Sequence, residues 1–244
     1  MTKLPLDQRL VDLGFADSKA KAQGLILSGN VLVNDRPVDK SKALVDSEAA
    51  IRLKVPSPPF VSRGGLKLNE ALKAFQVDVA QKICMDVGAS TGGFTDCLLQ
   101  AGAKKVYAID VGYGQFAWKL RNDPKVILLE KHNIRHLGKT LVPDPIELVV
   151  IDVSFISLKA VFPSLLPFLA HPSQVVALIK PQFEVAATKI GKKGVVSDGA
   201  AIEETKKAIE EAGKQCGWTS AGMISSPILG AEGNQEFLIL FQVQ

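Results

Sequence analysis

The stretch that decides the fold is Met85-Asp86-Val87-Gly88-Ala89-Ser90-Thr91-Gly92-Gly93-Phe94-Thr95, and it is followed by Val106-Tyr107-Ala108-Ile109-Asp110. The first stretch is typical of a buried strand that leads through a glycine-containing turn into a helix. The second is typical of a strand that ends in a carboxylate. In an open α/β sheet, this arrangement places a nucleotide-like ligand across the carboxyl ends of the strands.

The glycine spacing indicates the kind of ligand. Gly88, Gly92 and Gly93 let the backbone approach a ligand where a Cβ atom would collide. Asp110 lies 22 positions after Gly88, where it can accept hydrogen bonds from ribose hydroxyls. The spacing differs from the dinucleotide-binding fingerprint, and no phosphate-loop lysine follows, so a pyrophosphate is not expected. The pattern favours S-adenosylmethionine; a tight turn in an unrelated α/β protein is the alternative.

The residues expected to contact this cofactor lie in the glycine turn and at the neighbouring strand ends. They are Asp86, Gly88, Ala89, Ser90, Thr91, Gly92, Gly93, Phe94, Asp110, Asn133 and Asp152. Asn133 would contact the adenine edge, or else cap a loop. Trp118 would border the adenine pocket, or else belong to the core. No metal site is expected, because His132 and His136 have no acidic or cysteine partner at a suitable spacing.

The composition fits a folded protein with a large core. The chain has 244 residues, of which 47% are hydrophobic, enough for one large domain or for a large and a small one. No run approaches the ~18 apolar residues of a membrane-spanning helix, and residues 1–7 lack the apolar core of a signal peptide. The three cysteines follow no metal-binding or disulfide pattern. A reduced, cytoplasmic protein is therefore expected.

The positive charge is concentrated near the N-terminus. Residues 1–82 contain 13 Lys and Arg against 9 Asp and Glu, whereas the other 162 residues contain 16 of each. A local excess of this kind indicates a surface for a polyanion, most commonly nucleic acid. An ordinary solvated face is the alternative.

The chain is expected to form two domains, residues 1–59 and 60–244. The first has short helical patterns, with Ser18 as a helix N-cap, and then short strands with a hairpin turn at Asn34-Asp35. Pro56, Pro58 and Pro59 form a stiff connection. This part reads as a small α+β domain.

From residue 61 onward, helical and strand patterns alternate. We expect strands at 83–87, 105–110, 126–130, 147–153 and 174–180, a helix over 157–169, and another helix over 200–213 before two last strands near 220–226 and 236–243. The alternation predicts an α/β fold with a Rossmann-like, mostly parallel sheet and helices on both faces. The last two strands have no helix between them, which predicts an antiparallel strand at the edge of the sheet.

Four charged residues stand at element ends where they could converge: Lys67, Asp152, Lys180 and Glu236. Charges at the carboxyl ends of buried parallel strands point into the ligand crevice. Such a set could remove the proton from a hydroxyl such as a ribose 2′-OH, with Lys180 as the candidate base. A lysine accepts a proton only in its neutral form, which burial and the nearby ammonium of Lys67 would both favour.

These motifs also resemble known families. Residues from 60 onward resemble FtsJ-type 2′-O-ribose methyltransferases, and the start of the chain resembles an S4 RNA-binding domain. Together they resemble the TlyA family, described as haemolysins and understood as ribosomal RNA 2′-O-methyltransferases. The resemblance rests on 16–22 and 29–38, on Ser62-Arg63-Gly64-Gly65, on 86–96, on Asp152-Val153-Ser154-Phe155-Ile156-Ser157-Leu158 and on Lys180-Pro181-Gln182-Phe183-Glu184.

The resemblance implies a Lys-Asp-Lys-Glu tetrad at Lys67, Asp152, Lys180 and Glu236, S-adenosylmethionine as methyl donor, and ribosomal RNA or ribosomal subunits as partner. Two positions depart from the S4 pattern, because Pro5 and Lys19 stand where arginines are usual. The cations expected to contact RNA are Lys19, Lys21, Arg36, Lys40, Lys42, Arg63, Lys189, Lys192 and Lys193. The loop 189–194 could close over RNA or be a plain surface loop.

Two other functions remain open on the sequence. One is a membrane-active haemolysin. The sequence argues against this function, because it shows no export signal, no spanning segment and no long amphipathic surface helix. The other is a non-catalytic RNA-binding or ribosome-assembly factor. The intact set of four charged residues argues against this function. Aromatic residues make up only 6% of the chain, so recognition of folded RNA by shape and backbone is expected rather than base stacking.

Overall fold

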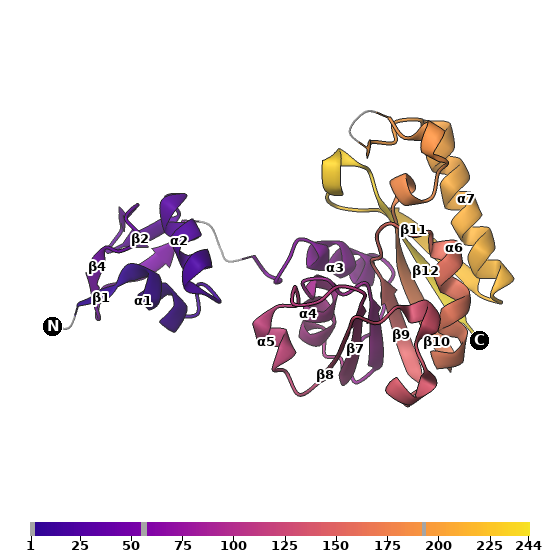
Figure 1. The fold of residues 1–244 in the computed structure, drawn as a ribbon, viewed down its shortest axis with the longest axis horizontal. Helices are drawn as coiled ribbons and strands as arrows, with labels where there is room; N and C mark the ends of the chain where they lie inside the picture. Colours follow the sequence, from indigo (N-terminus) through magenta and orange to yellow (C-terminus); the bar gives the residue numbers. More distant parts are fainter. Residues whose placement is uncertain (1–2, 55–57, 192–193) are drawn as a thin grey trace. The chain divides into compact units, whose positions relative to one another are not determined.

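The computed structural model describes residues 3–54, 58–191 and 194–244. The chain divides into two compact units, residues 1–59 and 60–244 (Figure 1). Each unit has its own hydrophobic core, so each is described by itself.

Over residues 3–54, the first unit is a small α+β fold with two helices, a three-stranded sheet ordered β3-β2-β5 and a two-stranded sheet β1-β4. Its elements are β1 (Lys3–Pro5), α1 (Leu6–Asp12), α2 (Lys19–Leu27), β2 (Val31–Val33), β3 (Arg36–Pro37), β4 (Leu44–Asp46) and β5 (Ile51–Leu53). Leu6, Leu10, Ile26 and Val31 are fully buried and form the centre of its core.

Local sequence signals explain two features of this unit. The Ser18 hydroxyl accepts a hydrogen bond from the backbone N–H of Lys21 at 3.3 Å and caps α2, as predicted. Asn34 and Asp35 have φ values of 49° and 63°, the left-handed pair that a tight hairpin turn between β2 and β3 requires. The three-residue strands β1 and β4 are too short to leave a periodic pattern, and the sequence did not predict them.

The second unit is built around a seven-stranded sheet. Its helices and strands are α3 (Gly64–Ala74), β6 (Ile83–Val87), α4 (Gly93–Gln100), β7 (Lys105–Asp110), α5 (Trp118–Arg121), β8 (Val126–Glu130), β9 (Ile146–Ile151), α6 (Leu158–Val161), β10 (Leu169–Ile179), α7 (Gly199–Gln215), β11 (Thr219–Ser225) and β12 (Phe237–Val243). Short 3₁₀ turns are η1 (Ile134–His136), η2 (Lys139–Leu141), η3 (Phe162–Phe168), η4 (Pro181–Phe183), η5 (Ala187–Lys189) and η7 (Ala231–Gly233).

The sheet order is β11-β12-β10-β9-β6-β7-β8. Strands β6 to β10 are parallel, whereas β12 is antiparallel to both of its neighbours. The predicted mostly parallel sheet with an antiparallel pair at one edge is therefore confirmed. The antiparallel strand itself lies second from the edge, because β12 inserts between β10 and β11.

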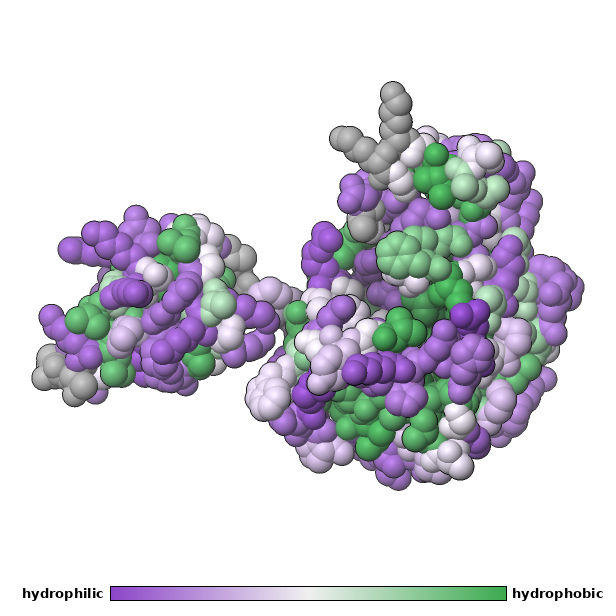
Figure 2. Space-filling model, in the orientation of Figure 1, coloured by the Kyte–Doolittle hydropathy of each residue, from purple (hydrophilic) through white to green (hydrophobic). Residues whose placement is uncertain are grey.

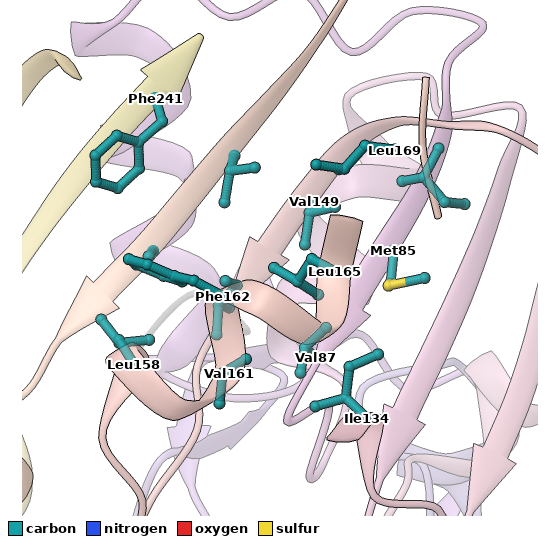
Figure 3. Packing of buried hydrophobic residues seen from close by; sticks show 14 of the residues in the cluster. Met85, Val87, Ile134, Val149, Leu158, Val161, Phe162, Leu165, Leu169 and Phe241 are labelled. Carbon is teal, nitrogen blue, oxygen red and sulfur yellow. The ribbon is translucent and has the colours of Figure 1, made fainter. Parts of the chain in front are cut away.

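Helices cover both faces of this sheet (Figure 1). Alternate strand residues face opposite sides: Cys84 and Leu148 pack with α3 and α4, whereas Met85 and Val149 pack with α6, η3 and α7. Figure 3 shows the second of these clusters, in which Phe162 and Leu165 pack against the strands. Because helices cover both faces, the central strands β6, β7 and β9 are buried on both sides, as expected for a parallel sheet.

One predicted helix is wrong. Residues 157–169 do not form a single α-helix: α6 ends at Val161, and the 3₁₀ turn η3 continues to Phe168. Pro163 and Pro167 lie in this segment and lack the N–H groups that an α-helix needs. Strand β10 then begins at Leu169, five residues before its predicted start.

The surface of the second unit is mixed in polarity. Figure 2 shows hydrophobic side chains among hydrophilic ones on the face in view. Large hydrophobic side chains that are well exposed include Phe155 (90%) and Trp118 (71%). The exposure of Trp118 excludes the predicted alternative that it belongs to the core.

Candidate active site

The site lies where the strand order reverses. From β6, the chain continues to β7 and β8 on one side, and then to β9 and β10 on the other. Ligands of open α/β sheets bind at such a reversal, outside the carboxyl ends of the strands. Here the turn after β6 touches the end of β9: the N–H of Asp152 donates to the carbonyl of Val87 at 2.9 Å.

Close backbone packing explains the first glycine of the turn. Gly88 has a φ of 86°, and a Cβ atom built on it would lie 2.5 Å from the carbonyl oxygen of Asp152. Gly92 also has a positive φ and is the N-cap of α4, where a Cβ atom would lie 2.6 Å from a methyl group of Leu120. The turn therefore needs glycine both for its conformation and for its contacts.

Asp110 holds the turn from the neighbouring strand. One carboxylate oxygen accepts the N–H of Ser90 at 2.7 Å, and the other accepts the N–H of Gly112 at 2.6 Å. A carboxylate has about four acceptor positions, so Asp110 can still accept hydrogen bonds from a ligand. Ser90 itself has a φ of 49°, which turns its N–H toward this carboxylate.

Asp86 supports the same turn from inside the core. Its side chain is completely buried, and Oδ2 accepts a hydrogen bond from the Thr95 hydroxyl at 2.6 Å. Burial raises the pKa of Asp86 to about 7, against the opposing effect of the Thr95 hydrogen bond. The hydrogen bond joins β6 to α4, the two elements on either side of the turn.

Two cavities open beside the turn. The larger, about 640 Å³, is lined by the expected cofactor residues Asp110 and Asn133 and by Val111, Phe155 and Ile156. The smaller, about 240 Å³, is lined by Ala89, Thr91, Gly93, Phe94 and Lys67. Gly88, Ser90 and Asp152 line both, so the two cavities adjoin. A volume of this size suits a nucleoside ligand.

Asn133 combines a capping role with a place at the cavity wall. Its Oδ1 accepts the backbone N–H of Arg135 at 3.0 Å and so caps η1. The residue also lines the larger cavity, where its Nδ2 group is a donor of the kind that reads an adenine edge.

The four predicted charged residues form two ion pairs. Lys67 Nζ lies 2.5 Å from Glu236 Oε2, and both side chains are almost fully buried. Lys180 Nζ lies 2.6 Å from Asp152 Oδ1, while it donates a hydrogen bond to the Ser154 hydroxyl at 3.0 Å. Lys67 and Asp152, one from each pair, line the same small cavity.

The strand ends explain how these residues meet. Asp152 follows β9 directly, and Lys180 follows the neighbouring strand β10. Glu236 immediately precedes the antiparallel strand β12, which brings the start of that strand to the same edge of the sheet. Lys67 lies in the first turn of α3, whose face packs on this part of the sheet.

A further carboxylate joins the two loops that carry the second pair. Glu184 accepts a hydrogen bond from the Ser157 hydroxyl at 2.5 Å and from the N–H of Leu158 at 2.8 Å. Burial raises the pKa of Glu184. Glu184 therefore fixes the segment after Asp152 to the segment after Lys180. Sequence reasoning placed it in a motif but gave it no role.

Other residues at the site were not predicted. Ser62, Ile228 and Gly230 line the small cavity. Phe155, at the rim of the larger one, has a φ of 63° and packs against Phe183, with ring centroids 5.0 Å apart. A left-handed phenylalanine leaves no sequence signal, because nothing in the residue type favours that conformation.

The cations predicted to contact RNA are on the surface. Lys19, Lys21, Arg36, Lys40, Lys42, Arg63 and Lys189 are all exposed. Lys21 forms an ion pair with Asp17, Lys189 forms one with Glu204, and Arg63 lines the small cavity. Lys192 and Lys193 lie outside the described residues.

Metal ligation and membrane spanning have no structural support in the described residues. Within residues 3–54, 58–191 and 194–244, no group of three or more His, Cys, Asp or Glu is placed to hold a metal ion. Among the helices of the described part of the chain, none combines the length and the apolar character needed to cross a bilayer.

The fold and the site together define a methyltransferase with a Rossmann-like sheet. The family described as FtsJ-like methyltransferase matches residues 60–243, and the S4 domain matches residues 4–51. The 16S/23S rRNA (cytidine-2'-O)-methyltransferase TlyA of Mycobacterium tuberculosis is 42% identical over 98% of this chain and 90% of its own length.

Two further relatives carry a different name. Hemolysin A of Brachyspira hyodysenteriae is 40% identical over 97% of this chain and 98% of its own length. A solved structure described as a hemolysin from Streptococcus thermophilus is 38% identical, with a TM-score of 0.75 over 99% of this chain and 89% of that one. The chain therefore belongs to the FtsJ-like methyltransferases, in the TlyA family that joins them to an S4 domain. The predicted family and fold class are confirmed.

Proposed function

We propose that this protein transfers a methyl group from S-adenosylmethionine to a ribose 2′-hydroxyl of ribosomal RNA. The observation that carries this proposal is the pairing of two lysines with two carboxylates, Lys67–Glu236 and Lys180–Asp152, beside the glycine turn. A hydroxyl nucleophile needs a base and fixed polar neighbours, and this arrangement supplies both.

The cavities fit the proposed methyl donor. Asp110 would accept hydrogen bonds from the ribose of the donor, Asn133 would contact its adenine, and the turn from Gly88 to Ser90 would approach its amino-acid end. A Cβ atom at Gly88 would lie 2.5 Å from the carbonyl oxygen of Asp152, so glycine keeps the turn close to the end of β9, beside both cavities. When bound, S-adenosylmethionine supplies an electrophilic methyl group.

The four charged residues have different roles at the target hydroxyl. Lys180 Nζ, once it has released a proton to solvent, accepts the proton of the 2′-OH. Asp152 Oδ1, 2.6 Å away, then stabilises the ammonium that forms, and the Ser154 hydroxyl orients it. The Lys67 ammonium, held by Glu236, lines the small cavity together with Asp152 and stabilises the negative charge that develops on the ribose oxygen.

RNA binding is proposed for the S4 unit and the exposed cations of the second unit. The S4 match and the exposed Lys19, Arg36, Lys40 and Lys42 support contact with phosphates. Because the M. tuberculosis relative is described as acting on 16S and 23S ribosomal RNA, ribosomal RNA is the proposed substrate here. The cytoplasm is then the place where the enzyme meets it.

The test is incubation of the protein with unmodified ribosomal subunits and radiolabelled S-adenosylmethionine, followed by mapping of the labelled nucleotide. We expect the label on a ribose and an about 10²–10⁴-fold slower transfer by Lys180→Ala. Lys159→Ala, which alters an exposed lysine on α6, is the matched control and should transfer normally.

Other outcomes separate the competing functions. A label on a base would overturn the proposed chemistry. Donor binding without transfer to any RNA would indicate a ribosome-assembly factor. Lysis of cells by the purified protein, with equal lysis by Lys180→Ala, would indicate a haemolysin.

A further inference from the structure

The connection between β11 and β12 lies beside the Lys67–Glu236 pair. Ile228 and Gly230, from this connection, line the small cavity together with Lys67. Gly230 lies so close to Glu236 that a Cβ atom built on it would collide with the carboxyl group. The position of the Glu236 carboxylate therefore depends on the path of residues 226–236.

Asn234 fixes that path from inside the protein. The residue is only 2% exposed. Its backbone carbonyl accepts the N–H of Gly230 at 2.8 Å, which closes the chain into a loop just before Glu236. Glu232 and Gly233, within this loop, both have positive φ values, so the loop is held in a conformation that needs support.

The support comes from a distant segment. Asn234 Oδ1 accepts the N–H of Val196 at 3.0 Å, and Nδ2 donates to the carbonyl of Gly194 at 2.9 Å. An amide side chain that both donates and accepts thus links two backbone segments outside the strands of the sheet. Val196 is itself buried, so the anchor is part of the packed structure.

We propose that Asn234 is a positioning residue for methyl transfer, which anchors the 226–236 loop to residues 194–196 and so holds the Glu236 carboxylate against Lys67. This inference rests on the proposed function and assigns to that reaction a residue outside the tetrad. Asn234 acts through Gly230 and Glu236, and it does not line either cavity beside the glycine turn.

The experiment compares Asn234→Ala and Asn234→Asp with the parent protein in methyl transfer to ribosomal subunits and in donor binding by calorimetry. Asp keeps the acceptor for Val196 but loses the donor to Gly194. We expect kcat to fall by about 10–100-fold in both, because small displacements of catalytic groups have effects of this size. The dissociation constant of S-adenosylmethionine should stay within about 2-fold, since Asp110 and the glycine turn are untouched.

A matched control separates positioning from stability. Asp144 accepts hydrogen bonds from Lys105 Nζ and the Tyr107 hydroxyl at the opposite, amino-terminal edge of the sheet. Asp144→Asn should lower the melting temperature but leave kcat within about 2-fold of the parent. If Asn234→Ala fails to fold, Asn234→Asp decides the question.

A double-mutant cycle identifies the route of the effect. In a Glu236→Gln background, Asn234→Asp should lower the residual rate by no more than about 2-fold, because the group it positions is already removed. An equal loss in both backgrounds, or a parallel loss of donor binding, would overturn the inference. A kcat within about 3-fold of the parent would also overturn it. A parent protein with no methyl transfer at all would instead overturn the proposed function.

Discussion

At the scale of single residues, the site depends on charges that are buried in opposite pairs. The Lys67 and Glu236 side chains are 11% and 2% exposed. Removing one partner of such a pair leaves the other charge buried without compensation, which costs about 3–5 kcal/mol, whereas replacing both with neutral residues is often neutral. The pair therefore affects stability and chemistry in separable ways.

Variants of this pair should show the separation. Lys67→Met is expected to lower the free energy of unfolding by about 3–5 kcal/mol, and the double variant Lys67→Met/Glu236→Gln to recover most of it. Neither should transfer methyl groups at the parent rate. Urea unfolding and label transfer measure the two effects. Full activity in the stable double variant would contradict a role of the pair in the reaction.

Asp86 gives a prediction about pH. Its pKa is raised by burial to about 7, above that of the unfolded chain, so the folded protein binds the extra proton. Stability from this group is complete below about pH 4 and falls as the pH rises to about 7. Asp86→Asn removes the titration and can still accept the Thr95 hydrogen bond.

We therefore expect Asp86→Asn to raise the melting temperature relative to the parent at pH 8 and to raise it much less at pH 5. Thermal unfolding at both pH values measures the difference. An equal change at the two pH values would show that Asp86 does not titrate in this range.

At the scale of elements, the turn between β6 and α4 has glycines with positive φ values and also packs closely against the backbone at Asp152. Gly88 and Gly114 both have positive φ values, of 86° and 76°, but only Gly88 has atoms within reach of a Cβ. Gly114→Ala is therefore a matched control for backbone strain alone, which costs about 1–2 kcal/mol.

Gly88→Ala should be clearly more destabilising than Gly114→Ala, because the new methyl group must displace the backbone at Asp152. It should also weaken the binding of S-adenosylmethionine, since the turn and the end of β9 line both cavities. Calorimetry and thermal unfolding test this. Equal effects of the two substitutions would indicate that strain, and not the contact with Asp152, explains the requirement for glycine.

Sequence patterns predicted those elements whose signals are local. The alternation along β6 and β7, the glycine turn and the Ser18 cap are each written in a few adjacent residues. The predicted helix over residues 157–169 was wrong because two prolines interrupt a segment whose apolar residues have helical spacing. The pairing within the tetrad could not be predicted either, since it depends on β10 lying beside both β9 and β12, and strand order is a property of the whole sheet.

At the scale of the whole molecule, the proposed function assigns donor binding to the second unit and part of the RNA binding to the first. The described residues that line the two cavities beside the glycine turn belong to the second unit, whereas the S4 match lies in the first. Substitutions in the first unit should therefore change RNA affinity without changing donor affinity.

The double variant Lys40→Ala/Lys42→Ala tests this division. It should weaken RNA binding and reduce the magnitude of the log–log salt slope by about 0.7–0.9 for each phosphate that is no longer neutralised. Lys104→Ala/Lys125→Ala is the control, because these exposed lysines precede β7 and β8 at the edge of the sheet away from the cavities. A slope that stays the same in the first variant would remove Lys40 and Lys42 from the RNA interface.

The insertion of β12 between β10 and β11 affects when the protein becomes active during folding. Lys67 and Glu236 are separated by 169 positions, and Glu236 reaches its partner only when β12 has entered between two strands that precede it. Long-range pairing of this kind is slow, because loop-closure entropy is lost before the contact forms. A partly folded chain in which only β6, β7 and β9 had assembled would already contain the nucleoside pocket. It could not yet methylate a ribose, because Glu236 would not have reached Lys67. Methyl transfer would therefore begin only when β12 has joined the sheet.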